Sequence, residues 1–137
     1  MSRFGLFRAH AIAYAIPLPR LLKVLSGERC YPLPRLPRTV TGVVVWDEQL
    51  IPQLDLDRLL GCSVEVVGQA VYQVLVASEC GILALSADQT CGIVAGESGE
   101  LVTVTDKANP GITGDFHFQG AVFHILDIDS LAIDLTQ

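Results

Sequence analysis

The chain has 137 residues, of which 50% are hydrophobic and 18% charged, with a formal net charge of −6 and a mean hydropathy of +0.46. This length suits one compact domain, and this composition excludes a disordered chain. No segment reaches the roughly 18 uninterrupted apolar residues that a membrane-spanning helix needs, so none is predicted. The acidic total excludes general nucleic-acid binding, because a phosphate track requires clustered Lys and Arg.

The charges are distributed unevenly along the chain. Residues 1–61 contain eight of the nine Lys and Arg and five of the fifteen Asp and Glu, a net charge of +3, whereas residues 62–137 have a net charge of −9. This polarity is consistent either with drift in surface charge or with head-to-tail association into a homo-oligomer. The charged fraction is below the roughly 25% of an average domain, which favours a chain that buries part of its surface against a partner.

An internal repeat is the most informative pattern. At an offset of 72 residues, the dipeptide Thr-Gly at 41–42 recurs at 113–114, and LDLD at 54–57 recurs as LDID at 126–129. A weaker match at an offset of 69 sets AYAI, which begins at Ala13, against ILAL. The repeat predicts one structural unit that is used twice.

Short β-rich runs separated by turn residues continue through both copies. In chain order we expect strands at residues 4–8, 12–16, 41–46, 50–54, 72–77, 82–85, 93–96, 101–104, 116–118 and 122–126. Single helical turns are expected at residues 56–60, after Asp55, and at residues 130–135, after Asp129, because Asp caps the free amides at a helix start.

Strands at this spacing, about 8–12 residues, predict barrels or a sandwich rather than a parallel α/β sheet. We therefore expect an all-β fold of two small barrels, from about residues 1–61 and 70–133. Each barrel either keeps its own terminal strands or exchanges them with the other barrel. Neither barrel has enough core alone, so the two should share an apolar seam. The leucine-rich segment 18–25, which begins between Pro17 and Pro19, is expected to form a short helix or an irregular strand.

Two pairs of acids are candidates for a carboxylate dyad. Asp55 and Asp57 form one pair and Asp127 and Asp129 the other, and residues two apart on a strand share a face. Both pairs occupy the same place in the repeat, just before a short helical turn. Helix capping and strand termination explain this placement, so we favour a structural role.

Histidines and cysteines offer a weaker alternative. His117 and His124 are expected on adjacent strands, where they could oppose each other and, with the Asp127/Asp129 pair, form a ligand or metal site in a small β-barrel protein. No third ligand is evident by spacing, and none of the four cysteines forms a Cys-x-x-Cys pair, which favours reduced thiols in a cytosolic protein. No cofactor fingerprint or nucleophile–base set is present, so neither a cofactor nor an enzyme is predicted.

Apolar residues are the remaining candidates for function. Trp46 stands beside Asp47 and Glu48, and tryptophan is enriched at partner surfaces, although a core position is equally expected. Leu18 and Leu21 belong to the segment 18–25, for which core packing is the default expectation and a partner surface the alternative.

Several segments together resemble the CheW-like domain family. Residues 49–56 (QLIPQLDL), preceded by residues 40–44 (VTGVV), are similar to its most recognisable motif. Further likenesses extend over nearly the whole chain, at residues 14–16, 33–37, 81–85 and 125–131. The resemblance implies a single CheW-like domain over residues 1–137, made of two SH3-like five-stranded β-barrels around a common hydrophobic centre.

The resemblance also implies a function. The family consists of cytoplasmic adaptors without catalysis or cofactor, which couple chemoreceptor cytoplasmic tips to the regulatory domain of a CheA-type histidine kinase. A groove between the barrels serves the receptor and a barrel end serves the kinase, and on matching positions Leu18, Leu21 and Ile51 lie near the receptor groove. Asp47 and Glu48 stand where the family usually carries Arg-Gly, so an acid replaces a cation at a turn next to Trp46.

Overall fold

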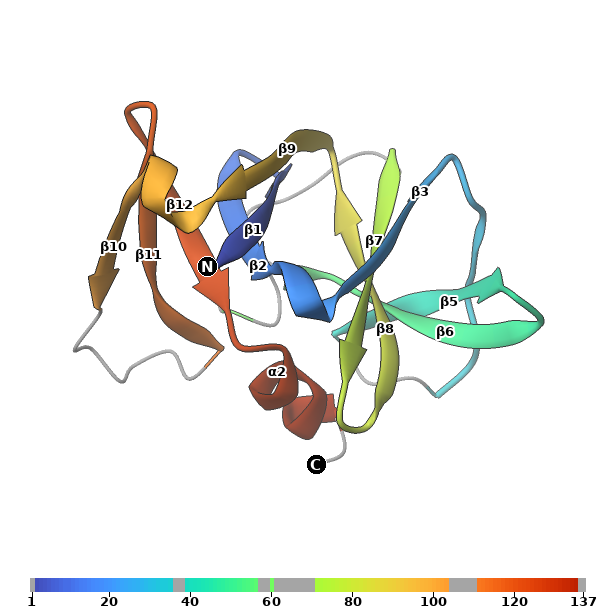
Figure 1. The fold of residues 1–137 in the computed structure, drawn as a ribbon. Helices are drawn as coiled ribbons and strands as arrows, with labels where there is room; N and C mark the ends of the chain where they lie inside the picture. The colour runs from blue at the N-terminus through green and yellow to red at the C-terminus, as the bar shows by residue number, and fades with distance from the viewer. Residues whose placement is uncertain (1, 36–38, 57–59, 61–70, 104–110, 136–137) are drawn as a thin grey trace.

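Two six-stranded sheets and a C-terminal helix make up the computed structural model, which describes residues 2–35, 39–56, 60, 71–103 and 111–135 (Figure 1). The first sheet has the order β10-β11-β12-β2-β1-β9. Its strands are β1 (Arg3–Ala9), β2 (Ile12–Pro17), β9 (Gln89–Ala95), β10 (Glu100–Thr103), β11 (Ile112–Phe118) and β12 (Ala121–Leu126).

The second sheet has the order β3-β7-β8-β6-β5-β4. Its strands are β3 (Leu21–Ser26), β4 (Cys30–Tyr31), β5 (Val40–Trp46), β6 (Gln49–Leu54), β7 (Tyr72–Ser78) and β8 (Gly81–Ala87). The 3-10 turn η1 (Leu18–Arg20) connects the sheets, and η2 (Gly96–Ser98) connects β9 to β10. The all-β prediction is confirmed, with six strands in each sheet because of the short edge strands β4 and β10.

The two sheets exchange hairpins. The N-terminal hairpin β1–β2 joins β9–β12, and the hairpin β7–β8 joins β3–β6. In each sheet the exchanged hairpin is attached through a short parallel contact, β2 with β12 and β8 with β6. Each sheet therefore takes strands from both of the sequence ranges 1–61 and 70–133. Figure 1 shows the exchanged hairpins in the centre, between β10–β11 on one side and β5–β6 on the other.

The sequence repeat is a structural repeat. Strands β5 and β6 correspond to β11 and β12 at an offset of 72, and β1 and β2 begin 69 residues before β7 and β8. In both copies the register shifts at the Thr-Gly dipeptide, and Thr41 and Thr113 each donate a hydrogen bond to a carbonyl of the paired strand, at 3.2 and 3.5 Å. A Cβ atom at Gly42 would lie 2.5 Å from a carbonyl oxygen of the neighbouring edge strand, and one at Gly114 would lie 3.0 Å from its counterpart. The dipeptide is thus explained by a bulge packed tightly against an edge strand.

Three apolar clusters hold the molecule together. One fills each barrel, and the third lies in the seam between the barrels, as the sequence predicted. The exchanged hairpins are buried on both faces: on β7, Val74 and Val76 point into the seam, whereas Leu75 points into a barrel. This explains why these hairpins are almost continuously apolar. The seam consists of Phe7, Ala9, Tyr14, Ile16, Leu54, Leu56, Val74, Val76, Leu83, Leu85, Ala87, Leu126, Ile128, Leu131 and Ala132.

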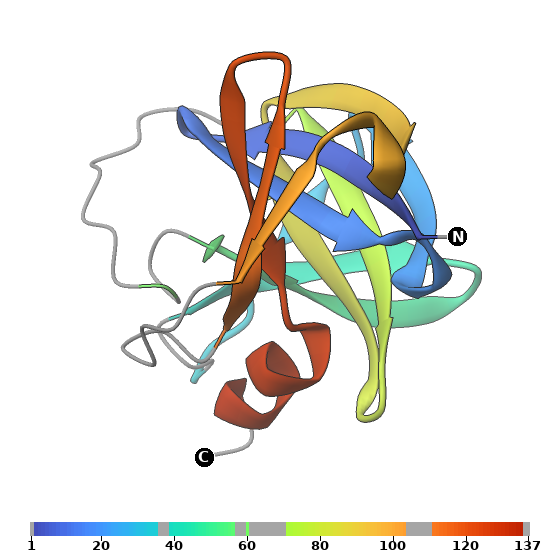
Figure 2. The ribbon, with the colours of Figure 1, turned by 60° about the vertical axis from the view of Figure 1, so that its left-hand side comes forward.

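The helix α2 (Ile128–Leu135) covers one end of the seam, as Figure 2 shows below the strands. It begins two residues earlier than predicted, because Asp127 rather than Asp129 is the cap: its Oδ1 accepts a hydrogen bond from the Ser130 amide at 3.2 Å. The helical turn expected at residues 56–60 is marked by the Leu60 amide, which donates to the Leu56 carbonyl at 2.8 Å. Within the described residues, no helix has the length and apolar character required to span a membrane.

The exchange also mixes the charges that are separated in the sequence. The segments 3–17 and 89–126, which supply the first sheet, contain three Lys and Arg and four Asp and Glu. The segment 21–87, which supplies the second sheet, contains five Lys and Arg and seven Asp and Glu. Neither sheet is built from net basic segments. Each sheet therefore draws on both the basic and the acidic half of the sequence, and head-to-tail association stays a prediction.

Candidate partner-binding surfaces

The segment that crosses from one sheet to the other carries half-buried leucines. Leu18 lies in η1 and Leu21 begins β3, so both stand at the junction of the barrels. A Cβ atom on Gly5 of β1 would lie 2.9 Å from Leu21 Cδ2, which shows how closely Leu21 packs on the opposite sheet. The cross-strand partner of Gly5 is Ile93 of β9, which is 59% exposed.

Exposed apolar residues continue onto β3. Val24 pairs with Val74 of the seam and is exposed, and Leu22 is exposed at the register shift of this strand. Of the two forms expected for residues 18–25, the structure has both: η1 is a short 3-10 helix, and β3 is an irregular strand. We call Leu21, Leu22, Val24 and Ile93 the junction surface. It draws on strands of both sheets, as a binding site between two barrels requires.

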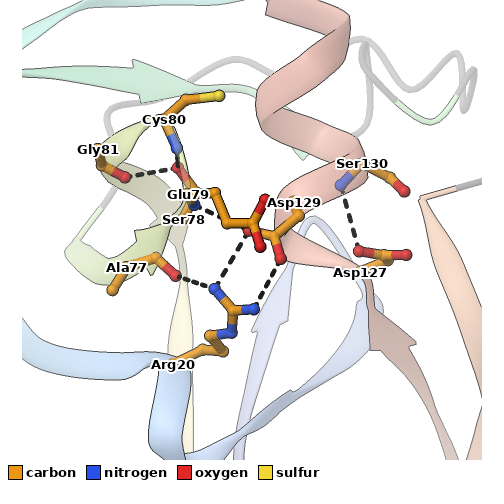
Figure 3. Close-up of polar contacts among 9 residues, drawn as sticks. All are labelled: Arg20, Ala77, Ser78, Glu79, Cys80, Gly81, Asp127, Asp129 and Ser130. Atoms are coloured by element: carbon orange, nitrogen blue, oxygen red, sulfur yellow. Dashed lines mark hydrogen bonds and ion pairs between the residues drawn. The ribbon is translucent and has the colours of Figure 1, made fainter.

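Arg20 fixes the junction to the helix (Figure 3). Its Nη2 lies 2.6 Å from Asp129 Oδ2, and its Nη1 donates to Asp129 Oδ1 at 3.1 Å and to the Ala77 carbonyl at 3.2 Å. The Glu79 amide donates to the same Asp129 Oδ1 at 2.9 Å. One ion pair thus connects η1, the turn after β7 and the first turn of α2. Asp127 caps the helix and Asp129 binds Arg20, so the structural interpretation of this acidic pair is confirmed.

The first acidic pair is described only in part. Asp55 directly follows β6 in the repeat position of Asp127, and the two backbone amides donate to the carbonyls of Thr39 and Gly111 at 3.0 and 2.9 Å. Asp57 lies outside the described residues.

The hairpin β5–β6 presents a second apolar surface. Val45 and Leu50 are cross-strand partners and are 46% and 68% exposed. Val43 lies on the same face of β5 and has Pro52 on one side and Tyr31 of β4 on the other. We call these five residues the hairpin surface. Val45 and Leu50 are its exposed centre, whereas Val43 is buried beneath its neighbours. At its tip, Asp47 and Glu48 form the turn and are both exposed.

Trp46 and Ile51 occupy the opposite face of this hairpin. Trp46 is half-buried against the cluster of the second barrel, to which Ile51 belongs with 1% exposure. Ile51 pairs with Val44 on the inward face, so its side chain does not offer a contact to a partner, and its place near a receptor groove stays a prediction. The partner-facing candidate missed by sequence reasoning is its neighbour Leu50. The alternation of side chains along a strand could have identified Leu50, because the residues on either side of a buried strand residue point outward.

The two histidines of β11 and β12 do not face each other. His117 is opposite Val122, and His124 is opposite Asp115, whose Oδ1 lies 2.7 Å from His124 Nδ1. The prediction that the histidines oppose each other is therefore wrong. In the part of the chain that the structure describes, no three His, Cys, Asp or Glu side chains come together as metal ligands. The alternative of a metal-binding barrel has no assembled site in these residues.

The family model for the CheW-like domain matches residues 3–135. The chain belongs to the CheW-like domain family. The crystal structure of the scaffolding protein TtCheW from Thermoanaerobacter tengcongensis has the same fold, with a TM-score of 0.79 and 14% sequence identity over 95% of this chain and 91% of that chain. A comparison with curated proteins finds no match.

The tip of the hairpin surface is a turn with an unusual backbone in this CheW-like chain. Asp47 and Glu48 both adopt left-handed backbone conformations, with φ of 51° and 60°. The corresponding turn of the second copy contains Gln119 and Gly120, with φ of 50° and 77°. The backbone therefore requires the conformation that glycine adopts freely, and Glu48 adopts it at an energetic cost.

Proposed function

We propose that the chain is a non-catalytic cytoplasmic scaffold of a chemotaxis-type signalling system. In this role it couples the cytoplasmic tips of chemoreceptors to the regulatory domain of a CheA-type histidine kinase. The observation that carries the proposal is the match to the CheW-like domain family over residues 3–135. The crystal structure of the same fold is that of a scaffolding protein, which is consistent with the role.

The two apolar surfaces provide a physical basis for bridging two partners. Burial of exposed aliphatic side chains contributes roughly 25 cal/mol per Å² of apolar area, and both surfaces lie on sheet strands that need little ordering on binding. We assign the junction surface, with Leu18 beside it, to the receptor tip. We assign the hairpin surface, with Asp47 and Glu48 at its tip, to the kinase, and the half-buried Trp46 on the other face supports this tip.

Calorimetric titration tests the role directly. The purified chain is titrated with receptor tips and kinase regulatory domains encoded in the same genome, and we expect saturable binding to one member of each class. Ile93→Ser should weaken binding of the receptor tip at least about tenfold, because it removes an exposed anchor from the junction surface. Val122→Ser, which changes an exposed valine outside both surfaces, is the matched control. Absence of binding to every receptor tip and kinase domain would overturn the proposed role.

A further inference from the structure

The internal repeat allows the hairpins β5–β6 and β11–β12, which share the same backbone arrangement, to be compared within one chain. The pairs Val43–Pro52 and Val45–Leu50 of β5–β6 correspond to Asp115–His124 and His117–Val122 of β11–β12 at the offset of 72. Both hairpins pair in the same register, and both turn through two residues with positive φ. Any difference in their outward side chains is therefore not required by the hairpin fold itself.

The outward faces of these hairpins differ in chemistry. The face of β11–β12 carries two histidines and an aspartate, with a hydrogen bond between His124 and Asp115. The corresponding positions of β5–β6 are all apolar, and Leu50 is 68% exposed. Because the second copy forms with polar residues at these positions, hairpin formation does not account for the apolar residues of the first. A contact with another apolar surface does account for the exposed pair Val45–Leu50, whereas Val43 is already buried within the chain.

The turns of the two hairpins also differ in their charge. The second copy has the uncharged pair Gln119-Gly120, whereas the first has two carboxylates at its tip, in Asp47 and Glu48. Neither carboxylate has an ion-pair partner among the described residues. Glu48 also occupies a backbone conformation that Gly120 adopts without strain in the second copy. The left-handed backbone itself belongs to the two-residue hairpin turn, since His10 and Ala11 adopt it as well. What distinguishes the turn of the first copy is its two exposed carboxylates, which are available to a cationic partner.

We propose that the hairpin surface docks a protein surface that is apolar at its centre and carries at least two Lys or Arg side chains placed to meet Asp47 and Glu48. The apolar pair Val45–Leu50 supplies the buried centre, and the two carboxylates fix orientation through charge complementarity. This inference rests on the proposed function and deepens it, because it gives the chemistry of the partner at this end of the scaffold.

Two probe peptides separate this chemistry from general attraction to an acidic protein. Both are β-hairpin peptides with Val and Leu on one face, one with Lys on either side of the apolar residues and the other with Glu in place of Lys. Binding to the full chain is measured by NMR chemical-shift titration at low and high salt. We expect the Lys peptide to shift residues of β5 and β6, and to bind at least about tenfold more tightly than the Glu peptide.

A matched pair of double variants locates the charge effect. Asp47→Asn with Glu48→Gln should reduce the affinity for the Lys peptide about tenfold, whereas Glu97→Gln with Glu100→Gln removes two exposed carboxylates elsewhere and should leave it unchanged. Leu50→Ser should abolish binding of both peptides. Equal loss in both double variants, shifts centred on β11–β12, or no binding of the Lys peptide would each overturn the proposal.

Two further outcomes are distinguishable. Self-association that Leu50→Ser removes in sedimentation would identify a second copy as the occupant, which also overturns the proposal. If receptor tips and kinase domains all fail to bind while the Lys peptide binds at β5–β6, the proposed function fails and the chemistry of the hairpin surface stands.

Discussion

Arg20 and Asp129 are 109 positions apart in the chain, yet their side chains form a two-pronged ion pair with distances of 2.6 and 3.1 Å. The pair joins the segment that crosses between the barrels to the helix that covers the seam. It also lies directly before Leu21, which begins the junction surface. The position of a candidate partner-binding surface thus depends on a contact between the first and last parts of the chain.

Removing this ion pair should loosen the junction. We expect Arg20→Ala to lower the free energy of unfolding by about 1 kcal/mol, because the pair is two-pronged but partly exposed. Urea unfolding measures the change. A double-mutant cycle with Asp129→Asn isolates the interaction, and Arg3→Ala, which removes an exposed cation from β1, is the control. Additive effects in the cycle would contradict the assigned contact.

The turn of the hairpin surface should be stabilised by glycine. Glu48→Gly relieves a left-handed conformation and should raise the free energy of unfolding by about 1 kcal/mol. Gly120→Ala makes the reverse change in the second copy and should lower it by a similar amount, since a Cβ atom there meets no other atom within 4 Å and only the backbone conformation opposes it. Thermal or urea unfolding of both variants tests the pair, and effects of equal sign would refute the explanation.

The two Thr-Gly bulges should differ in their tolerance of a methyl group. Gly42→Ala places a Cβ atom 2.5 Å from the Tyr31 carbonyl oxygen, so β4 must shift, and we expect a loss of about 2 kcal/mol. Gly114→Ala, with its nearest atom at 3.0 Å, should cost less. Comparison of the two urea midpoints decides whether the edge-strand contact is the cause.

The seam should depend on the helix side chains that enter it. Leu131 is fully buried in the seam cluster, so Leu131→Ala should lower the free energy of unfolding by about 3 kcal/mol. Ile133→Ala, on the same helix at a residue that is 50% exposed, is the control and should cost less than about 1 kcal/mol. A small effect at Leu131 would show that α2 contributes little to the seam.

Much of this fold could be predicted from local patterns. The strands around Tyr14, Val44 and Phe123 follow from alternating or continuous apolar runs, and the repeat at residues 41–42 and 113–114 identifies equivalent hairpins. The exchange of hairpins could not be deduced, because both copies carry the same local pattern and either hairpin satisfies it. The short connection η1 decides the arrangement, since β3 begins immediately after it in the other sheet.

The candidate site was predictable only in part. The turn at Asp47 and Glu48 was found because charged residues interrupt two apolar runs. The inward position of Ile51 and the outward position of Leu50 depend on the phase of one strand, which a nearly continuous apolar segment does not specify. The contact between Arg20 and Asp129 has no local sequence signal, because it is formed only when η1 and α2 meet.

The exchange of hairpins sets the order in which the two sheets can be completed while the chain is being synthesised. Residues 21–87 contain every strand of the second sheet, so that sheet is complete before β9 leaves the ribosome. The hairpin β1–β2 is made first but finds its sheet partners only when β9–β12 emerge last. Until then the nascent chain carries an apolar ribbon without its own sheet, and a chain that stops early leaves that ribbon for chaperones or for neighbouring chains.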